Sequence, residues 1–338
     1  MSKKILVLAT SFLDDLFTHP QEEGQAKEML ELLVNNSTED IVIEYRVDRD
    51  PNLPLSPEEL KDVVAIIADL EVYDKPLLDK VGIKNGGDLR LISRYGIGYS
   101  SIDLKAATEN GVIITNAPGC NAMPTAEWAQ STIMAVAGRR ILQYKTASIG
   151  KPKDGPSRLD VSGKTLGVIG TGTIGRNVVK LMNGFDMKVL AYDLYPNKEW
   201  ADRNRVQYVS LEEIYSQADF ITLHASASEQ IIGEKELNMM RPATALINCA
   251  RGILVDNRAA WKAVKEGRIW GYGLDEVWLE KDLPLDGLNI IVSSHVGSDT
   301  DMGKIGMQIM SVEAVLDFMQ KRFPKYVVNK EVLEKIEL

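Results

Sequence analysis

The sequence contains only two cysteines and three histidines among its 338 residues. Cys120 and Cys249 stand far apart in the chain, so they provide neither the close spacing of a zinc site nor a disulfide framework. We therefore expect no metal site. Sparse, unpatterned cysteine is also typical of a reducing compartment, so we expect a cytoplasmic protein.

Long apolar segments and basic blocks are also missing. The apolar runs are short and interrupted, which argues against a membrane-spanning helix. Lys and Arg together number 39 against 48 acidic residues, giving a net charge of −9. An acidic chain without a cluster of cations is a poor ligand for nucleic acid or for anionic membranes. The N-terminal MSKKILVLAT enters a strand-like run at once, unlike a signal peptide.

Short β-branched runs alternate with longer amphipathic stretches along the whole chain. The alternation predicts an α/β fold with two doubly wound parallel sheets. We expect one series of strands at 3–10, 41–47, 63–69, 89–96 and 112–117, and a second series at 164–170, 187–193, 218–224, 244–250, 271–275 and 289–294. Helices are expected at 22–36, 123–142 and 300–323, and a loop at 150–163.

The clearest motif is the glycine-rich segment GTGTIG, which has the spacing G-x-G-x-x-G at Gly170, Gly172 and Gly175. Alone, this spacing also occurs in turns that bind nothing. Here an apolar run precedes it and a helical pattern follows. Asp193 ends the next expected strand, 18 residues after Gly175. This context predicts a dinucleotide site, with a pyrophosphate at the helix N-terminus.

Asp193 bears on the choice of cofactor. A carboxylate at this position accepts hydrogen bonds from the adenosine ribose and repels a 2′-phosphate. We therefore expect NAD as the cofactor, although nearby basic residues could compensate and permit NADP.

Three further polar residues stand where apolar strands are expected to end. They are His224, Arg251 and His295. In open α/β sheets ligands gather beyond the carboxyl ends of the strands, so all three fall on the expected ligand rim. A strand-end histidine is more often a structural hydrogen-bonding group than a catalyst, and a lone Arg is commonly a solvated loop residue. His19, which lies in a polar N-terminal stretch, is expected to be ordinary surface.

The segments NCARGILVD, LDEVWLE and SSHVG resemble those of the D-isomer-specific 2-hydroxyacid dehydrogenases. The resemblance extends over nearly the whole chain, including RYGIGYSSIDLKAATENGVIITNAPGCNA and GKTLGVIGTGTIG. It implies a Rossmann NAD-binding domain, residues 120–299, inserted into a flavodoxin-like substrate domain formed by residues 1–119 and 300–338. It also implies a homodimer with the helix at 123–142 in its interface.

The resemblance implies a catalytic set of Arg251, Glu280 and His295. Arg251 would bind the substrate carboxylate with its planar fork of donors. His295 would exchange the proton of the 2-keto oxygen, and Glu280 beside the imidazole would stabilise its protonated form. Hydride would pass between the nicotinamide and the substrate carbon.

Secondary roles follow from the same resemblance. The backbone N–H groups of Ile97 and Gly98 would bind the substrate carboxylate. The remaining cofactor contacts would be made by Thr173 and Ile174 at the pyrophosphate, His224 and Ala225 at the adenosine ribose, and Cys249 and Asp275 at the nicotinamide. Cys249 would be a small lining residue, because nothing implies a covalent intermediate.

Several positions depart from the family pattern. Lys281 replaces the usual proline after Glu280, YSSID follows Gly98, and ASAS follows His224. The segment 69–73 (DLEVY) carries two acids where many relatives carry an Arg-Ser-like pair. Acids disfavour a phosphate, so we expect a 2-keto or 2-hydroxy acid without one, with a neutral or apolar side chain contacted by Tyr73 or Tyr99.

Three functions are compatible with these motifs. The first is an NAD-dependent D-2-hydroxyacid dehydrogenase acting as a 2-keto acid reductase. The second is a reductase specialised for glyoxylate, hydroxypyruvate or a sugar-derived acid, because the three catalytic residues would contact only the part common to these substrates. The third is a non-catalytic NAD-sensing protein of the same fold. Formate oxidation is disfavoured, since the additional polar pocket residues are missing.

Overall fold

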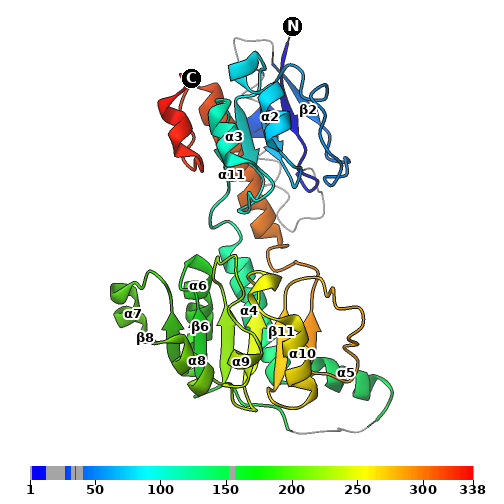
Figure 1. Ribbon diagram of the computed structural model, residues 1–338, viewed down its shortest axis with the longest axis vertical. Helices are drawn as coiled ribbons and strands as arrows, with labels where there is room; N and C mark the ends of the chain where they lie inside the picture. Colours follow the sequence, from blue (N-terminus) through cyan, green and yellow to red (C-terminus); the bar gives the residue numbers. More distant parts are fainter. Residues whose placement is uncertain (1, 13–26, 32–34, 36–40, 152–156, 338) are drawn as a thin grey trace. The chain divides into compact units, whose positions relative to one another are not determined.

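The computed structural model describes residues 2–12, 27–31, 35, 41–151 and 157–337. The chain divides into two compact units: unit 1 comprises Met1–Asn121 and Asp299–Leu338, and unit 2 comprises Ala122–Ser298. Each unit contains one parallel sheet between helices (Figure 1). The prediction of an α/β protein with two parallel sheets is therefore confirmed.

The sheet of unit 1 has five strands in the order β2-β1-β3-β4-β5. Their bounds are β1 Lys3–Val7, β2 Ile41–Tyr45, β3 Val63–Ala68, β4 Leu91–Arg94 and β5 Ile113–Thr115. This is the flavodoxin-like order, in which the direction of winding reverses between β1 and β3. The loops after β1 and β3 therefore diverge at the carboxyl edge of the sheet.

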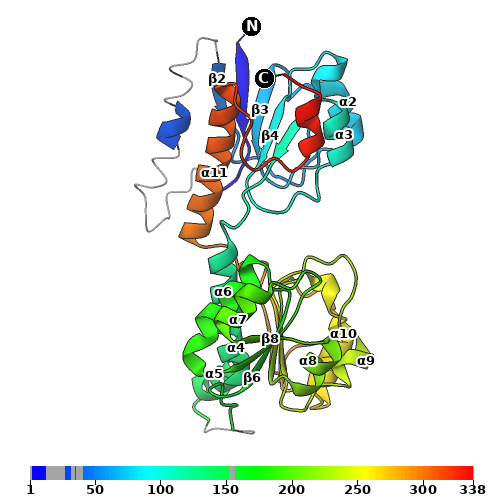
Figure 2. The same ribbon diagram turned by 90° about the vertical axis from the view of Figure 1, so that its left-hand side faces the viewer.

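Both faces of this sheet are covered, because successive side chains of a strand point to opposite faces. Ile5 and Val7 of β1 pack in the same cluster as Val312 and Val315 of α11 (Asp301–Met319). Leu6 belongs to the opposite cluster, which includes residues of α2 (Lys75–Val81) and α3 (Leu104–Glu109). Figure 2 shows α11 on one side of the strands and α2 with α3 on the other. The described part of the unit also contains two short 3-10 helices, η1 (Ile83–Asn85) and η4 (Lys330–Glu334).

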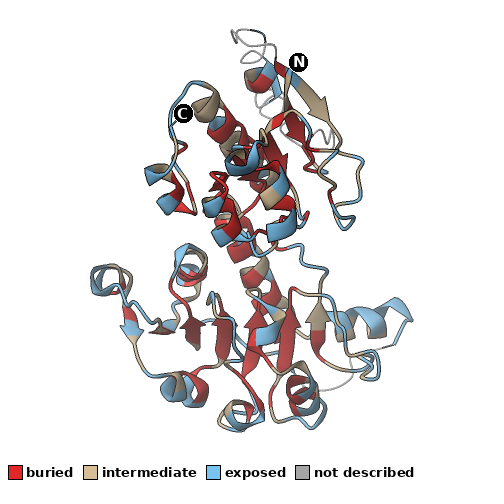
Figure 3. Ribbon diagram, turned by 45° about the horizontal axis from the view of Figure 1, so that its top comes forward, coloured by how far each residue is buried: buried red, intermediate tan, exposed pale blue. Residues whose placement is uncertain are grey.

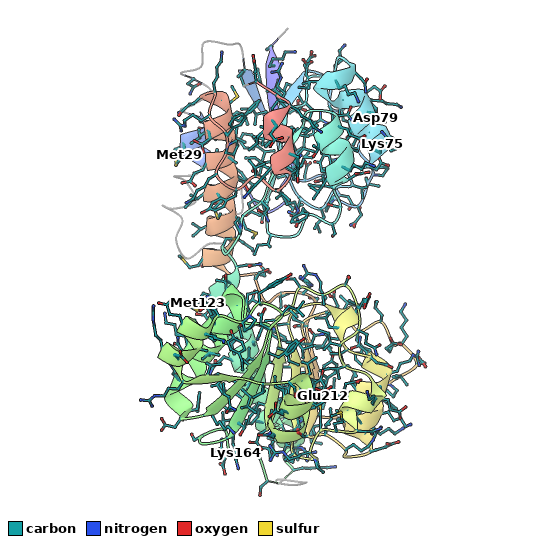
Figure 4. The ribbon with its side chains drawn as sticks, turned by 60° about the vertical axis from the view of Figure 1, so that its left-hand side comes forward. Met29, Lys75, Asp79, Met123, Lys164 and Glu212 are labelled. Carbon is teal, nitrogen blue, oxygen red and sulfur yellow. The ribbon has the colours of Figure 1, made fainter. Side chains whose placement is uncertain are left out.

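Local capping explains where the two short helices of unit 1 begin. The Asp74 side chain accepts a hydrogen bond from the Leu77 N–H at the start of α2, and Asp103 caps α3 in the same way. On the exposed side of α2, Lys75 lies 2.8 Å from Asp79 (Figure 4), and Asp79 also accepts a 2.8 Å hydrogen bond from Asn110 beyond α3. This polar link joins α2 to the end of α3.

The sheet of unit 2 has seven strands in the order β12-β11-β10-β9-β6-β7-β8. Their bounds are β6 Thr165–Ile169, β7 Lys188–Tyr192, β8 Val206–Tyr208, β9 Phe220–Leu223, β10 Ala245–Asn248, β11 Gly271–Leu274 and β12 Ile290–Val292. Read from β8, the first six strands follow the dinucleotide-binding order 3-2-1-4-5-6. The direction of winding reverses between β6 and β9.

Two layers of helices bury this sheet. One face packs against α4 (Ala122–Ala137) and α6 (Thr173–Met182), and the other against α8 (Leu211–Gln217), α9 (Glu234–Leu237) and α10 (Asn257–Lys265). Figure 3 shows the central strands as buried segments between more exposed helices. The remaining elements are α5 (Arg140–Ser148), α7 (Lys198–Asn204), η2 (Asn183–Phe185) and η3 (Gly252–Leu254).

The expected strands are present, but the structure adds one and breaks one expected helix. Strand β8 was not predicted, because three residues between polar neighbours carry no readable alternation. The helix expected at 123–142 is two helices, α4 and α5, separated at Gly138 and Arg139. Arg139 adopts a left-handed conformation with φ of 50°, which a continuous α-helix excludes.

Two other expectations fall partly outside the described residues. Of the helix expected at 22–36, residues 27–31 and 35 are helical, and the rest lies outside the described residues. Residues 152–156 of the expected loop and His19 also lie outside the described residues. The terminal helix expected at 300–323 is α11, which begins where Thr300 accepts a hydrogen bond from Gly303 and ends at Met319.

Candidate active site

The carboxyl ends of five strands in unit 2 lie side by side because the strands are in register. Ile169 pairs with Leu223, Leu223 with Asn248, Asn248 with Leu274, and Leu274 with Val292. Each of these residues is the last of its strand before a loop. The residues that follow, Gly170, His224, Cys249, Asp275 and Ser293, therefore begin one continuous rim.

The glycine-rich loop joins β6 to α6 at this rim. Gly170 has φ of 95°, and a Cβ there would lie 2.7 Å from the backbone N of Ala225. A Cβ on Gly175 would lie 2.1 Å from the Gly170 carbonyl oxygen, so α6 packs directly on the loop. Both positions therefore require glycine.

The N-terminus of α6 has open space beside Gly172 and backbone N–H groups that no side chain caps. Gly172 is its N-cap and supplies no side-chain hydrogen bond, and a Cβ there would meet nothing within 4 Å. Thr173 and Ile174 form the first turn. Uncapped N–H groups at an open helix N-terminus suit a phosphate. The loop thus fits the pyrophosphate of a dinucleotide.

Asp193 follows β7 and folds back onto the same loop. Its Oδ2 accepts hydrogen bonds from the Thr171 N–H at 2.6 Å and the Thr171 hydroxyl at 2.9 Å, and its Oδ1 accepts one from the Tyr195 N–H at 2.9 Å. Burial opposes ionisation, but these hydrogen bonds and the Arg176 cation outweigh it and lower the pKa of Asp193. A fixed negative charge therefore stands beside the glycine-rich loop.

His224 and Cys249 form a neutral pair in the middle of the rim. The His224 Nε2 lies 2.9 Å from the Thr222 hydroxyl, and its Nδ1 lies 3.3 Å from the Cys249 sulfur. Burial lowers the pKa of His224 to about 3. Burial and, secondarily, the Asp275 charge raise the pKa of Cys249 to about 12. Near neutral pH His224 is therefore uncharged and Cys249 is a thiol, so neither suits proton transfer or nucleophilic attack.

Arg251 projects from a loop that Asn248 holds in place. The buried Asn248 amide donates to the Arg251 carbonyl at 2.8 Å, and its oxygen accepts from the Ala250 N–H at 3.1 Å. The Arg251 side chain is exposed and donates to the Ala250 carbonyl at 2.7 Å. In the described part of the chain it makes no ion pair, so most of its donors are available to a ligand carboxylate.

His295 stands in a loop that the Asp275 carboxylate holds. The Ser293 hydroxyl and the Val296 N–H donate to Oδ1 at 2.7 and 2.9 Å, and the Gly297 N–H donates to Oδ2 at 2.7 Å. Within this loop His295 has φ of 60°, an uncommon conformation for a residue with a side chain. The imidazole is 53% exposed. Asp275 therefore binds the Ser293 side chain before the exposed His295 and the backbone after it.

Two carboxylates follow Asp275, and the structure gives them different partners. Glu276 Oε2 lies 3.5 Å from His295 Nδ1, whereas Glu280 Oε2 lies 2.9 Å from the Nε of Arg258. Among the residues that the structure describes, Glu280 makes no ion pair with His295. The expected contact between Glu280 and the imidazole is therefore replaced by one with Glu276, a residue that the sequence motifs did not single out.

A pocket of about 630 Å³ lies beside Arg251, Glu276 and Glu280. Its lining includes Gln230, Arg251, Ile253, Arg258, Glu276 and Glu280. The pocket thus brings together the predicted Arg251 and Glu280 with a second acid, Glu276.

Ile97 and Gly98 belong to unit 1 and follow β4. The Asn116 amide donates to the Ile97 carbonyl at 2.9 Å, and the Ala117 N–H donates to the Gly96 carbonyl at 2.9 Å. Gly98 is exposed, and a Cβ there would meet nothing within 4 Å. Asn116 therefore fixes a loop whose glycine faces open space.

Two features are absent from the described residues. Within the described ranges, no group of three or more His, Cys, Asp or Glu side chains is placed to hold a metal ion. Among the same residues, no helix is long and apolar enough to cross a membrane.

The Asp275 hydrogen bonds generate a testable prediction. In Asp275→Asn an amide NH₂ replaces an acceptor that faces N–H and O–H donors, which leaves at least one buried donor unpaired. Such a loss costs about 1–3 kcal/mol. We expect hydrogen exchange to become faster at Val296 and Gly297, as measured by mass spectrometry.

Ser293→Ala is the matched control, because it removes only one of the three bonds. Exchange in Ser293→Ala should remain closer to that of the wild type. Unchanged protection of Val296 and Gly297 in Asp275→Asn would show that the carboxylate does not hold the loop.

Comparisons with known proteins agree with this architecture. Residues 132–297 match the model of the D-isomer specific 2-hydroxyacid dehydrogenase, NAD binding domain. A glyoxylate reductase of Thermococcus litoralis is 34% identical over 309 residues, covering 86% of this chain and 92% of the relative. A D-3-phosphoglycerate dehydrogenase of Methanocaldococcus jannaschii is 34% identical over 285 residues, covering 81% of this chain and 54% of the relative.

Solved structures show the same fold. A protein from Thermus thermophilus superposes with a TM-score of 0.77 at 27% identity, covering 96% of this chain and 99% of that one. The apo-structure of D-lactate dehydrogenase from Escherichia coli gives a TM-score of 0.76 at 22% identity, with coverage of 96% and 99%. The resemblance predicted from the sequence motifs is thus confirmed, and the chain belongs to the D-isomer-specific 2-hydroxyacid dehydrogenase family of NAD(P)-dependent oxidoreductases.

Proposed function

We propose that the protein is an NAD-dependent D-2-hydroxyacid dehydrogenase that reduces a 2-keto acid without a phosphate group. The observation that carries the proposal is the rim of unit 2, where exposed Arg251 and His295 stand on loops fixed by buried Asn248 and Asp275. In this assignment unit 2 corresponds to the NAD-binding domain predicted at 120–299. Unit 1 corresponds to the substrate domain predicted at 1–119 and 300–338.

The reaction consumes a 2-keto acid, NADH and a proton, and yields a 2-hydroxy acid and NAD⁺. Bound NADH supplies the hydride that reduces C2 of the substrate. Arg251 binds the substrate carboxylate through its guanidinium. In unit 1, the family resemblance assigns substrate binding to the N–H groups of Ile97 and Gly98. His295 donates a proton to the C2 oxygen. Arg251 thereby fixes the orientation in which C2 receives the hydride.

We assign the remaining predicted residues to binding of the cofactor. Gly170, Gly172 and Gly175 let the backbone approach the pyrophosphate, with Thr173 and Ile174 at the helix N-terminus. We place His224 and Ala225 at the ribose side and Cys249 with Asp275 at the nicotinamide side. The neutrality of His224 and Cys249 supports a lining role for both.

The segment after β3 supports a substrate without phosphate. The Asp69 carboxylate accepts hydrogen bonds from the Thr10 N–H at 3.0 Å and the Thr10 hydroxyl at 2.9 Å. The Glu71 side chain is fully buried, and this burial raises its pKa. Leu70 and Val72 remain 56% and 57% exposed. The exposed side chains of this segment are thus apolar, and residues 69–73 offer no cation to a phosphate.

One substrate contact suggested by the sequence is wrong. Tyr73 is fully buried in the core of unit 1, where its backbone N–H bonds to the Ser101 carbonyl at 2.9 Å. It therefore packs under the loop instead of facing a ligand. Tyr99 is 39% exposed and stays a candidate.

A reductase specialised for glyoxylate is the second candidate. It is favoured by the curated relatives at 33–34% identity that are named glyoxylate reductase. Arg251 and His295 contact only the part of the substrate common to all 2-keto acids, so they do not distinguish the two candidates.

NADH oxidation by the purified protein tests the proposed function. The assay compares pyruvate, branched and aromatic 2-keto acids, glyoxylate, hydroxypyruvate and 3-phosphohydroxypyruvate. We expect turnover of unphosphorylated 2-keto acids, and a loss of about 10²–10⁴ in kcat for His295→Asn with NADH binding unchanged, because a general acid is removed. His19→Asn should retain activity and serves as the control. NADH binding without turnover of any 2-keto acid would contradict the proposed enzymatic function and favour a nucleotide-sensing protein.

Asp193 should determine the preference for NAD. Its charge beside the glycine-rich loop repels a 2′-phosphate, so the wild type should favour NADH over NADPH. In Asp193→Ser, the ratio of kcat/KM for NADPH to that for NADH should rise about tenfold, equivalent to about 1.4 kcal/mol. A wild type that prefers NADPH would contradict this expectation.

We infer that the protein is a homodimer and that α5 contributes to the interface. The family resemblance placed the interface on 123–142, a range that contains most of α4 and the first residues of α5. Helix α5 has no buried residue. Tyr144 of α5 and Ile149, the residue that follows the helix, are 73% and 65% exposed. Exposed large apolar side chains that gather on one segment are typical of protein interfaces.

Light scattering after size-exclusion chromatography tests this inference. We expect a dimer for the wild type and a monomer for Tyr144→Glu, because a buried unpaired charge weakens an interface. Leu53→Glu, which changes a 56% exposed residue of unit 1, should stay dimeric. A wild type that is monomeric at micromolar concentration would disprove the dimer.

A further inference from the structure

The carboxyl ends of β6, β7 and β8 carry a group of polar residues beside the glycine-rich loop. Thr171 follows β6, Asp193 follows β7, and Tyr208 is the last residue of β8. The three strands are neighbours, and the register pairs Tyr208 with Ala191 of β7. The polar side chains therefore meet at the β8 end of the rim, whereas the His295 loop follows β12 at the other end.

Hydrogen bonds connect these residues in a series that ends on Asp193. The Thr171 hydroxyl donates to Asp193 Oδ2 at 2.9 Å, and its oxygen lies 2.7 Å from the Tyr208 oxygen. The Tyr208 oxygen accepts a 3.2 Å hydrogen bond from the N–H of Asn197, the N-cap of α7. Thr171 has one hydroxyl proton, and the carboxylate of Asp193 receives it. Tyr208 must therefore donate to Thr171, so every proton in the series points toward the carboxylate.

The backbone of Thr171 is held as firmly as its hydroxyl. The residue is buried, and its N–H donates to Asp193 Oδ2 at 2.6 Å. Its carbonyl accepts a 2.7 Å hydrogen bond from the Arg176 Nε in α6. The Arg176 guanidinium lies over the Trp200 ring of α7, 5.2 Å from the ring centroid. Contacts from both helices thus keep the Thr171 hydroxyl between the carboxylate and Tyr208.

We propose that Tyr208 is a positioning residue for Asp193 and that, acting through Thr171, it strengthens the preference for NAD over NADP. This inference rests on the proposed function, in which Asp193 faces the adenosine ribose. Hydrogen bonds that follow one another from donor to acceptor polarise each other, so the Tyr208 hydroxyl makes Thr171 a stronger donor to the carboxylate. A carboxylate held in one place repels a 2′-phosphate more than one that can rotate away. Tyr208 acts without contacting the cofactor.

Equilibrium binding of NADH and NADPH to the full-length chain tests the proposal, because binding needs no turnover. The readout is the Kd for NADPH divided by the Kd for NADH. Tyr208→Phe removes the donor to Thr171, Thr171→Val removes the threonine hydroxyl, and Thr171→Ser keeps it. A double variant combines Thr171→Val with Tyr208→Phe. Tyr215→Phe is the matched control, because it removes a tyrosine hydroxyl that donates to the Ile231 carbonyl at 3.3 Å on the other face of the sheet.

We expect the ratio to fall about threefold in Tyr208→Phe, which loses a neutral hydrogen bond, and about tenfold in Thr171→Val, which loses one to a carboxylate. Thr171→Ser should keep the wild-type ratio, because the hydroxyl remains, and so should Tyr215→Phe. The double variant should match Thr171→Val, because Tyr208 acts only through the Thr171 hydroxyl.

Three results would overturn the role of Tyr208. They are a wild-type ratio in Tyr208→Phe, an equal weakening of both coenzymes in the variants, and a double variant in which the two effects add. A wild type that binds neither coenzyme would instead refute the proposed function, and the selectivity role with it. A wild type that prefers NADH while Tyr208→Phe keeps its ratio would leave the proposed function intact and refute only the role of Tyr208.

Discussion

The carboxylate of Asp275 is the constraint on which the rim of unit 2 depends. It stands at the end of β11 and accepts three hydrogen bonds from the loop that follows β12. These bonds hold His295 in a left-handed conformation and leave its imidazole exposed. Because β10 and β11 are in register, the same strand ends place the Arg251 loop alongside. The site is thus built from neighbouring strand ends, each loop fixed by one buried polar side chain.

The charges of this rim are divided in a way that suits the proposed chemistry. Burial keeps His224 and Cys249 neutral in the middle of the rim, while hydrogen bonds keep Asp193 ionised beside the glycine-rich loop. His295 is the exposed histidine of unit 2, so it is the group able to exchange protons with a ligand and with solvent. In the proposed reaction, the proton is therefore exchanged at His295, between neutral lining residues.

The sequence predicted the features that depend on periodicity and on glycine spacing. Apolar runs located the strands of both sheets except β8, and the G-x-G-x-x-G spacing located a loop where Gly170 and Gly175 meet backbone at close range. Features that depend on tertiary contacts could not be predicted from the sequence. A single residue, Arg139, ends α4 through its backbone conformation, and Tyr73 is buried although its neighbours Leu70 and Val72 are exposed. Glu280 pairs with Arg258, which no motif links to it, and Glu276 lies near His295.

The central claim is that this rim directs hydride and proton to a 2-keto acid in one orientation. The most direct measurement uses NADH deuterated at C4 on the transferred side, with chiral chromatography and mass spectrometry of the product. The account predicts a D-2-hydroxy acid that carries deuterium at C2. An L-2-hydroxy acid, or a product without deuterium, would contradict it.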